Sequence, residues 1–324
     1  MRMQILNKRW DCRTIAHNAR YLATIGTGVT IWNRETLEQI HHFTGIRWIH
    51  GGIFVNDDVL MIYTGEQKLY FLSIQEKRIL WSAPRPKELA TSGDMHCCRI
   101  PGTEKVACVA RGKKSLNDLF FLCIDWINRE ISLHRIPDCY RVISSIVWTQ
   151  ELGLTFLSYQ AKGDNMSHVH RIFQVTETGT FSILLDGEDS QIVRAYSGNY
   201  LFMSDKNELE PKMYVYALEQ SADADHLKLG IPKPLPLPTI RMNGPVGINR
   251  RRILPYIQWI DEKSGLLTTC HTAQWIGICD FRNQKLIQEY PHSSVYYGKI
   301  LDDNLLLGCA PGFSVVPLGL KAPE

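Results

Sequence analysis

The densest group of chemically active side chains in this sequence runs from Asp94 to Cys98 and reads DMHCC. Successive side chains of an extended strand point to opposite faces, so His96 and Cys98 share one face and Cys97 lies on the other. Imidazole and thiol groups are zinc ligands, but a zinc site needs three or four of them. The pattern therefore favours an ordinary strand, and we expect no metal here.

Three further groups contain residue types that bind metals or act as nucleophiles: His168 with His170, Cys270 with His271, and the acidic run at 186–189. The histidine pair lacks a third ligand, and the Cys–His pair lacks a residue that would orient the base. The acidic run lacks the alternating oxygen ligands of a calcium loop. We therefore expect strand and turn roles for all three groups.

Basic residues form a second kind of candidate site. Lys and Arg side chains bind carboxylates and phosphates, and Trp and Arg are enriched at the energetic centres of protein interfaces. We predict a partner-binding surface that prefers an acidic or phosphorylated protein partner and consists of Arg47, Trp48, Arg111, Lys113, Lys114, Arg250, Arg251 and Arg252.

The elements that must position these residues follow one repeated pattern. Segments that begin at Gly28, Lys68, Leu119, Val169 and Gln274 each read as an alternating apolar run, a short polar turn and a second alternating run. Alternation with a period of two predicts β-strands. Repetition at about 40 to 50 residues is typical of a β-propeller. We predict an all-β, seven-bladed β-propeller with four antiparallel strands per blade.

A short polar residue ends the first strand of each copy, at Asn33, Ser73, Asp125, Gln174 and Asp280. Such side chains bond to the backbone of a tight turn, and the second strand should resume five residues later.

This pattern resembles a degenerate WD repeat. Trp32-Asn33 comes nearest to the dipeptide that gives those repeats their name, while Ile124-Asp125 and Cys279-Asp280 keep only the Asp. The resemblance implies an interaction platform within a complex and carries over no functional residues.

The two ends of the chain are expected to close the ring. The last unit, which begins at Gly312, lacks a fourth strand after Pro317, while Met3–Leu6 is a spare strand. We predict that this N-terminal strand completes the last blade, because the pairing removes two free sheet edges.

One stretch, at about residues 219–252, is far longer than the usual connection of about 4 to 6 residues. Its segment Ile231–Pro238 reads IPKPLPLP and predicts a polyproline II or edge-strand path. We expect one propeller domain over residues 1–324, with this insertion serving as a loose loop or as a docking arm.

Composition limits the class of function. A net charge of +3 does not by itself imply a nucleic-acid or membrane partner. The nine cysteines fall mostly in apolar strand patterns, which favours buried thiols over a disulfide framework. No apolar stretch is long enough for a signal peptide or a membrane span. We expect a cytoplasmic protein without a cofactor.

Motifs of the common hydrolases, metalloproteases, P-loop proteins and dinucleotide-binding enzymes are missing from the sequence. Our first hypothesis is therefore a non-enzymatic intracellular protein–protein interaction scaffold, a subunit of a larger complex. The alternative is an enzyme or small-ligand binder that uses the central channel through His50, His96 and Cys98. A third hypothesis is that the basic surface binds single-stranded nucleic acid. A steep dependence of binding on salt concentration would reveal this activity.

Overall fold

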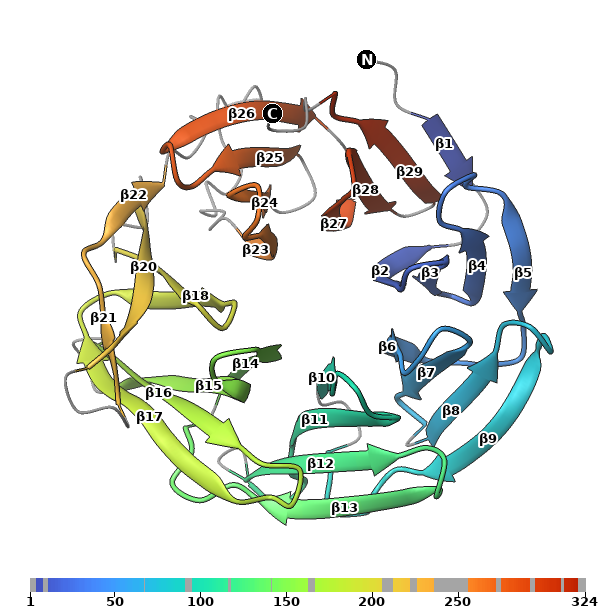
Figure 1. Cartoon of the computed structure of the whole chain (residues 1–324), viewed down its shortest axis with the longest axis horizontal. Coiled ribbons are helices and arrows are strands. Elements are labelled where there is room, and N and C mark those ends of the chain that lie inside the picture. Colours follow the sequence, from blue (N-terminus) through green and yellow to red (C-terminus); the bar gives the residue numbers. More distant parts are fainter. Residues whose placement is uncertain are drawn as a thin grey trace, which may run out of the picture.

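Seven antiparallel sheets surround a central axis in the computed structural model, as Figure 1 shows, and this confirms the predicted seven-bladed β-propeller. The structure describes residues 4–7, 11–66, 68–90, 95–115, 118–140, 142–162, 167–205, 212–221, 226–235, 256–271, 275–291, 295–309 and 312–319.

The first four blades follow the chain in order, each from its innermost to its outermost strand. Blade 1 consists of β2 (Cys12–His17), β3 (Tyr21–Gly26), β4 (Val29–Asn33) and β5 (Gln39–Phe43). Blade 2 consists of β6 (Ile49–Phe54), β7 (Val59–Thr64), β8 (Lys68–Ser73) and β9 (Arg78–Pro84). Blade 3 consists of β10 (Met95–Arg99), β11 (Lys105–Arg111), β12 (Leu119–Asp125) and β13 (Glu130–Arg135). Blade 4 consists of β14 (Val142–Thr149), β15 (Gly153–Lys162), β16 (Ser167–Val175) and β17 (Phe181–Asp189).

The last three blades include two departures from this order. Blade 5 consists of β18 (Ile192–Tyr196), β19 (Tyr200–Ser204), β20 (Met213–Gln220) and the short strands β21 (Leu227–Leu229) and β22 (Lys233–Leu235). Blade 6 consists of β23 (Tyr256–Asp261), β24 (Leu266–His271), β25 (Trp275–Asp280) and β26 (Lys285–Pro291). Blade 7 consists of β27 (Val295–Leu301), β28 (Asn304–Cys309), β29 (Gly312–Pro317) and β1 (Gln4–Asn7).

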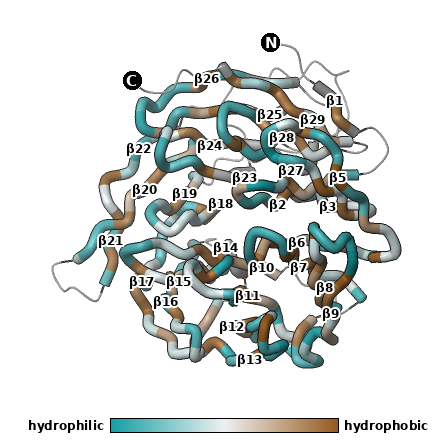
Figure 2. The backbone as a smooth tube through the Cα atoms, turned by 45° about the vertical axis from the view of Figure 1, so that its right-hand side comes forward, coloured by the Kyte–Doolittle hydropathy of each residue, from teal (hydrophilic) through white to brown (hydrophobic). Residues whose placement is uncertain are grey.

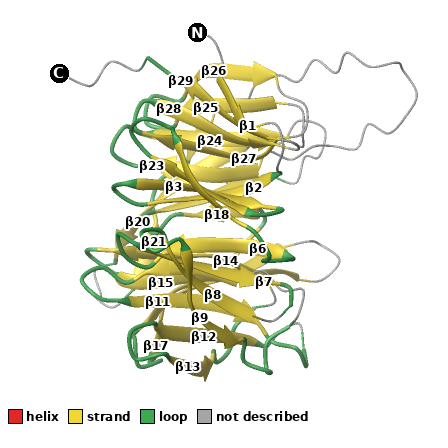
Figure 3. Cartoon of the chain, turned by 90° about the vertical axis from the view of Figure 1, so that its right-hand side faces the viewer, coloured by secondary structure: helices red, strands yellow, loops and turns green. Residues whose placement is uncertain are grey.

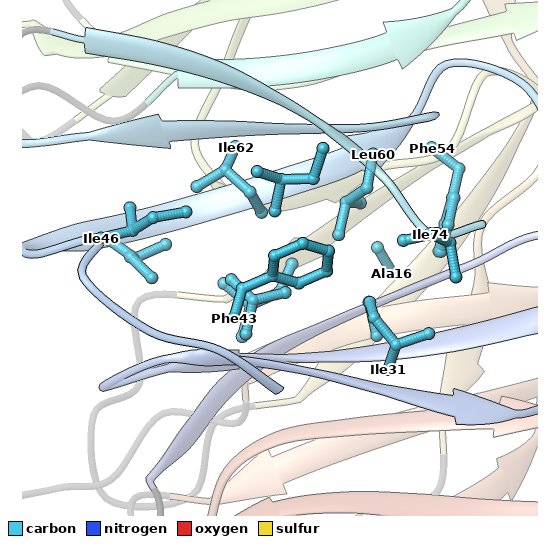
Figure 4. Close-up of a cluster of buried hydrophobic side chains, with 13 residues drawn as sticks. Ala16, Ile31, Phe43, Ile46, Phe54, Leu60, Ile62 and Ile74 are labelled. Carbon is cyan, nitrogen blue, oxygen red and sulfur yellow. The ribbon is translucent and has the colours of Figure 1, made fainter. Parts of the chain in front are cut away.

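The two middle strands of a blade are buried on both faces, because each face packs against a neighbouring blade. In blade 3, Phe121 and Ala107 pack toward blade 4, whereas Leu122 and Val106 pack toward blade 2. Figure 4 shows the equivalent core between blades 1 and 2, where Phe43 lies among aliphatic side chains of both sheets. In Figure 2 the apolar stretches follow the strands and the hydrophilic stretches mark many of the turns.

The first strand of the chain closes the ring, as predicted. β1 pairs with β29 in antiparallel register, with Gln4 opposite Val315 and Asn7 opposite Phe313, and Figure 1 shows the two side by side. The strand spans Gln4–Asn7, one residue later than the expected Met3–Leu6. The pairing gives β29 a partner on its outer edge and encloses a core between blades 7 and 1 that includes Phe313.

Four of the five predicted turn residues act as predicted. The side-chain oxygens of Asn33, Ser73, Asp125 and Asp280 each accept a hydrogen bond of 2.9 Å from the backbone N–H three residues later. The residue four positions on has a positive φ in each of these turns, and it is Leu37, Lys77, Arg129 or Gln284. A type I turn followed by a left-handed residue is a common way to connect two hairpin strands.

The prediction for Gln174 was wrong. Its Nε2 donates to the carbonyl of Leu152 at 2.7 Å, and the Oγ1 of Thr176 accepts the backbone N–H of Thr180 instead. Gly179, with a φ of 80°, supplies the left-handed residue, and β17 begins at Phe181. The turn is therefore shifted along the chain, because a long amide side chain reaches past the tight turn that Asn or Asp would bond.

Part of the predicted insertion forms the outer edge of blade 5. β21 and β22 both pair with β20, and the three residues between them lie opposite Tyr216 and Ala217, which makes a bulge. Ile231 lies in this bulge and is 86% exposed. An edge strand therefore forms at Lys233–Leu235, and Pro234 and the adjacent bulge hinder pairing with another strand. Residues 222–225 and 236–252 lie outside the described residues.

Deletion of residues 1 to 8 is expected to lower the melting temperature sharply, by an amount equivalent to roughly 3 kcal/mol or more. The deletion leaves the outer edge of β29 without its hydrogen-bonding partner and opens the core at Phe313. Thermal and urea unfolding measure the loss, and deletion of residues 320–324 is the matched control. A peptide of residues 1–11 added in trans should restore part of the stability, whereas an unchanged melting temperature would contradict this closure.

Replacement of Lys77 by Gly is expected to stabilise the protein by about 0.5 to 1 kcal/mol, because glycine adopts a positive φ without the steric cost of a Cβ atom. We expect Arg129→Gly to stabilise the protein by a similar amount. Gln75→Gly, in the same turn but without a positive φ, should destabilise the protein. Urea unfolding of the three variants tests the assignment, which fails if Lys77→Gly is as damaging as Gln75→Gly.

Candidate functional site

Loops that enter an innermost strand and loops that follow a second strand lie at the same end of the ring. Two contacts establish this for blades 2 and 3: Gly65 donates its N–H to the carbonyl of Trp48 at 2.8 Å, and Leu89 forms a β-bridge with Gly112. The side view in Figure 3 shows the described loops gathered at the two ends of the ring. The term "basic rim" is used below for Arg47, Trp48, Lys87, Arg111, Lys113 and Lys114.

Backbone hydrogen bonds hold the two loops of the basic rim together at the junction of blades 2 and 3. Ala90 donates to the carbonyl of Arg111 at 2.9 Å, and Lys113 donates to the carbonyl of Glu88 at 2.7 Å. The connection that leaves blade 2 therefore runs beside the turn between β11 and β12. This pairing brings Lys87 close to the lysines of the neighbouring blade.

The positive charge of the basic rim is only partly compensated. Lys87, Lys113 and Lys114 are exposed, and none of them has an ion-pair partner among the described residues. Asp118, on the same turn, is bound to Arg135 with 2.5 Å between Oδ1 and Nη2, so its charge is already neutralised. Glu88 remains as an exposed acid nearby. A carboxylate or phosphate of another molecule would find unpaired cations here.

Trp48 is unusual in both its exposure and its backbone. Its side chain is 75% exposed, and its φ is 53°, which a bulky residue rarely adopts. Strained backbone of this kind persists where the surrounding structure imposes it, and it clusters at binding sites. Arg47 next to it is also exposed. An exposed Trp–Arg pair has the composition of an interface anchor.

The structure places His50 apart from the other two predicted channel residues, which both lie on β10. His50 is the extra residue of a bulge in β6, and it lies against Gly65 on the rim, beside Trp48. His96 is half-buried on β10. Cys98 packs into the core between blades 3 and 4, and burial raises the pKa of its thiol to about 12. A thiol with such a pKa is a poor nucleophile at neutral pH.

Packing between blades explains this arrangement. Side chains of an innermost strand point alternately to the blades on either side, so Cys97 faces blade 2 and Cys98 faces blade 4. Alternation along the strand therefore directs neither side chain into the channel. Within the described part of the chain, no three His, Cys, Asp or Glu side chains gather as metal ligands.

The remaining sequence candidates have local roles or lie outside the described residues. Asp186 binds Arg171, with 2.5 Å between the two groups, and Asp189 accepts the N–H of Gln191, so the acidic run serves local contacts. Cys270 and His271 are the last two residues of β24, so both have a strand role. Asp94 and 250–252 lie outside the described residues, so that part of the predicted surface stays a prediction.

A cluster of titratable groups that the sequence reasoning missed lies in the seam between blades 7 and 1. Arg34 binds Asp302 through two hydrogen bonds of 3.0 and 2.6 Å. Burial, and after it the charge of Arg34, lower the pKa of Lys299 to about 8. Burial lowers the pKa of His17 to about 3, with Lys299 as the next cause. The signal available in the sequence was a lysine inside the apolar run of β27.

Comparison with known proteins identifies the fold alone. The β-propeller domain of Myceliophteria thermophila Cps50 (Swd1) matches with a TM-score of 0.65 and 12% identity over 97% of this chain and 99% of that chain. The Dos1 propeller matches with a TM-score of 0.56 and 17% identity over 93% of this chain and 75% of that chain. The computationally designed Ika8 protein matches with a TM-score of 0.55 and 12% identity over 96% and 98% of the two chains. No protein-family model and no curated protein matches this sequence.

The described residues contain no helix of the length and apolar character that would cross a membrane.

Replacement of Lys299 by Met is expected to stabilise the protein at pH 7 by about 2 kcal/mol, because it removes a charge held in a desolvated seam. The folded-state pKa is about 8 and the unfolded value is 10.5, so the penalty is complete below pH 8 and declines as the pH rises to 10.5. Urea unfolding of both proteins from pH 7 to 10.5 should show their stability difference shrinking. Lys263→Met, at an exposed position, is the control, and a difference that does not change with pH would contradict the assignment.

Proposed function

We propose that this chain is a degenerate WD-repeat-like propeller and acts as a non-enzymatic interaction scaffold within a larger complex. It binds an acidic or phosphorylated segment of a partner protein on the basic rim. The observation that carries this proposal is the strained, exposed Trp48 with Arg47, on the same rim as the unpaired lysines of blades 2 and 3.

The kinship with WD repeats rests on details of blade 1. Trp32 donates its Nε1–H to the Oγ1 of Thr24 at 3.0 Å, and Thr30 and His42 share a hydrogen bond of 2.8 Å. These bonds connect β3, β4 and β5 within the blade that contains the WD-like dipeptide Trp32-Asn33. They assign no partner.

A cytoplasmic location and a single propeller domain belong to the same proposal. Eight of the nine cysteines, all except Cys270, are free thiols in the structure, which suits a reducing compartment. The seven blades share one closed ring of inter-blade cores, which suits a single domain.

The geometry supports an enzyme in the channel less well. His50 lies on the rim, and Cys98 is buried in a blade interface with a raised thiol pKa. Catalysis needs an acid, a base or a nucleophile within reach of one reacting atom. The described side chains of the predicted channel set do not meet this condition.

The rim variants Trp48→Ala and Lys113→Ser/Lys114→Ser test the proposal. A glutamate-rich peptide and its phosphoserine counterpart serve as defined probes, and fluorescence anisotropy at 50 and 200 mM salt measures binding. Each variant should weaken binding about tenfold, because charge-assisted bonds and an aromatic anchor are lost. The matched control, Arg20→Ser/Lys263→Ser, removes two exposed basic residues from the opposite end of the ring.

Affinity capture with the same variants extends the test to the natural partner. Proteins that bind the wild type and the control but not the rim variants support the scaffold assignment. Equal capture of the same proteins by all variants would contradict the scaffold assignment. Tighter binding of a single-stranded RNA oligonucleotide than of either peptide would move the assignment to nucleic acid.

A further inference from the structure

Two cysteines face each other across the inner strands of blade 3. Cys97 on β10 is directly opposite Cys108 on β11, and their sulfur atoms are 3.2 Å apart. Residues opposite each other in an antiparallel pair have Cα atoms about 4.5 to 5.5 Å apart, which lies within the range that a disulfide spans. Closing the bond needs a movement of only about 1 Å.

Arg85 lies beside this pair. Its side chain is 3% exposed, and no hydrogen-bond partner reaches Nε, Nη1 or Nη2 within the described part of the chain. The groups in electrostatic contact with it are Cys97, Tyr63 and Cys108. A buried guanidinium without a partner is costly, so its position calls for a negative charge nearby. The guanidinium is therefore placed to stabilise the negative charge that develops on a sulfur of the cysteine pair when it reacts.

We propose that Cys97 and Cys108 are a reversible redox pair that closes into a cross-strand disulfide, with Arg85 as the cation that stabilises the reacting thiolate. The environment of each sulfur sets the order of events. Cys97 is half-buried and can be reached by an oxidant, whereas Cys108 is fully buried. Cys97 is therefore the attacking residue and Cys108 the resolving one.

The chemistry with a hydroperoxide balances in two steps. The Cys97 thiolate attacks the terminal peroxide oxygen, the O–O bond breaks, and the product is a sulfenic acid; the leaving oxygen takes a proton and departs as water or alcohol. Burial raises the pKa of the Cys108 thiol, so Cys108 reacts as a thiol and not as a free thiolate. Its sulfur, held against Cys97, attacks the Cys97 sulfur, the S–O bond breaks, and the departing hydroxide takes the Cys108 proton and leaves as water. Two thiols lose two electrons, and the peroxide gains them.

Competing partners for Cys97 are poorly placed. Cys98 is adjacent in the chain but faces blade 4, where it packs against the apolar core and contacts the carbonyl of Arg99 at 3.3 Å. A bond between Cys97 and Cys98 would require one of them to leave its blade interface. A disulfide within a reducing compartment is typically transient and regulatory, which fits a pair that opens and closes without unfolding the blade.

Peptide mapping of the intact protein tests the proposal. Trypsin releases Cys97 and Cys98 in peptide 88–99 and Cys108 in peptide 106–111. After brief treatment with hydrogen peroxide, denaturation and alkylation, the proposal requires these two peptides to be linked, and dithiothreitol must separate them. The Cys98→Ser protein assigns the bond to Cys97 without ambiguity. Cys12, buried in the core between blades 7 and 1, and Cys309, buried in the core between blades 6 and 7, should stay alkylatable and report that the fold is intact.

Arg85 variants test the role of the cation. Arg85→Met should slow formation of the linked peptide about tenfold, and Arg85→Lys should restore most of the rate, because only the charge is needed. An equal rate in Arg85→Met would overturn that role. Absence of the linked peptide, a bond confined to peptide 88–99, or oxidation of Cys97 that stops at sulfinic acid would each overturn the redox pair.

Discussion

Every blade of this molecule buries both of its faces against the blades on either side. The first and last blades must therefore also pack against each other, because otherwise each would expose one apolar face. This constraint explains why the seam between blades 7 and 1 matters more than any single side chain. There the chain supplies an outer strand from its own beginning, with Gln4 opposite Val315, and the neighbouring core forms around Phe313 and Trp32. At the remaining six junctions, the two blades that pack together follow each other directly in the sequence.

The same packing decides where chemistry can occur. Polar groups that lie in the blade junctions are desolvated. Arg85, in the connection after β9, is buried beside Cys97 and Cys108, and Lys299 of the inner strand β27 lies between blades 7 and 1. Such groups interact with their immediate neighbours in the junction and are withdrawn from a solvent-borne ligand. Exposed binding groups are left to the loops, where Trp48 and the lysines of blade 3 lie. Recognition on the rim and the cysteine chemistry inside a junction are thus consequences of one architecture.

The fold was predictable from the sequence because its signals are local. Alternation and the recurrence of a polar turn residue specified the hairpins, and the turn bonds at Asn33 and Asp125 follow from the short reach of those side chains. Gln174 broke the pattern because its longer amide bonds elsewhere. The positions of the site residues depend on contacts between blades, which no local sequence pattern contains. Arg85 directly follows β9 and is buried, because backbone bonds to blade 3 set the path of the connection after β9.

Pairing of the chain's two ends has a consequence for synthesis. Residues 4–7 leave the ribosome more than 300 residues before their partners at 313–315, which at about 5 to 20 residues per second is a delay of roughly 15 to 60 s. During this interval β1 has no hydrogen-bonding partner while the successive blades form. The nascent chain therefore passes through an incomplete, open ring. Its two exposed blade faces can associate with other nascent chains or with chaperones.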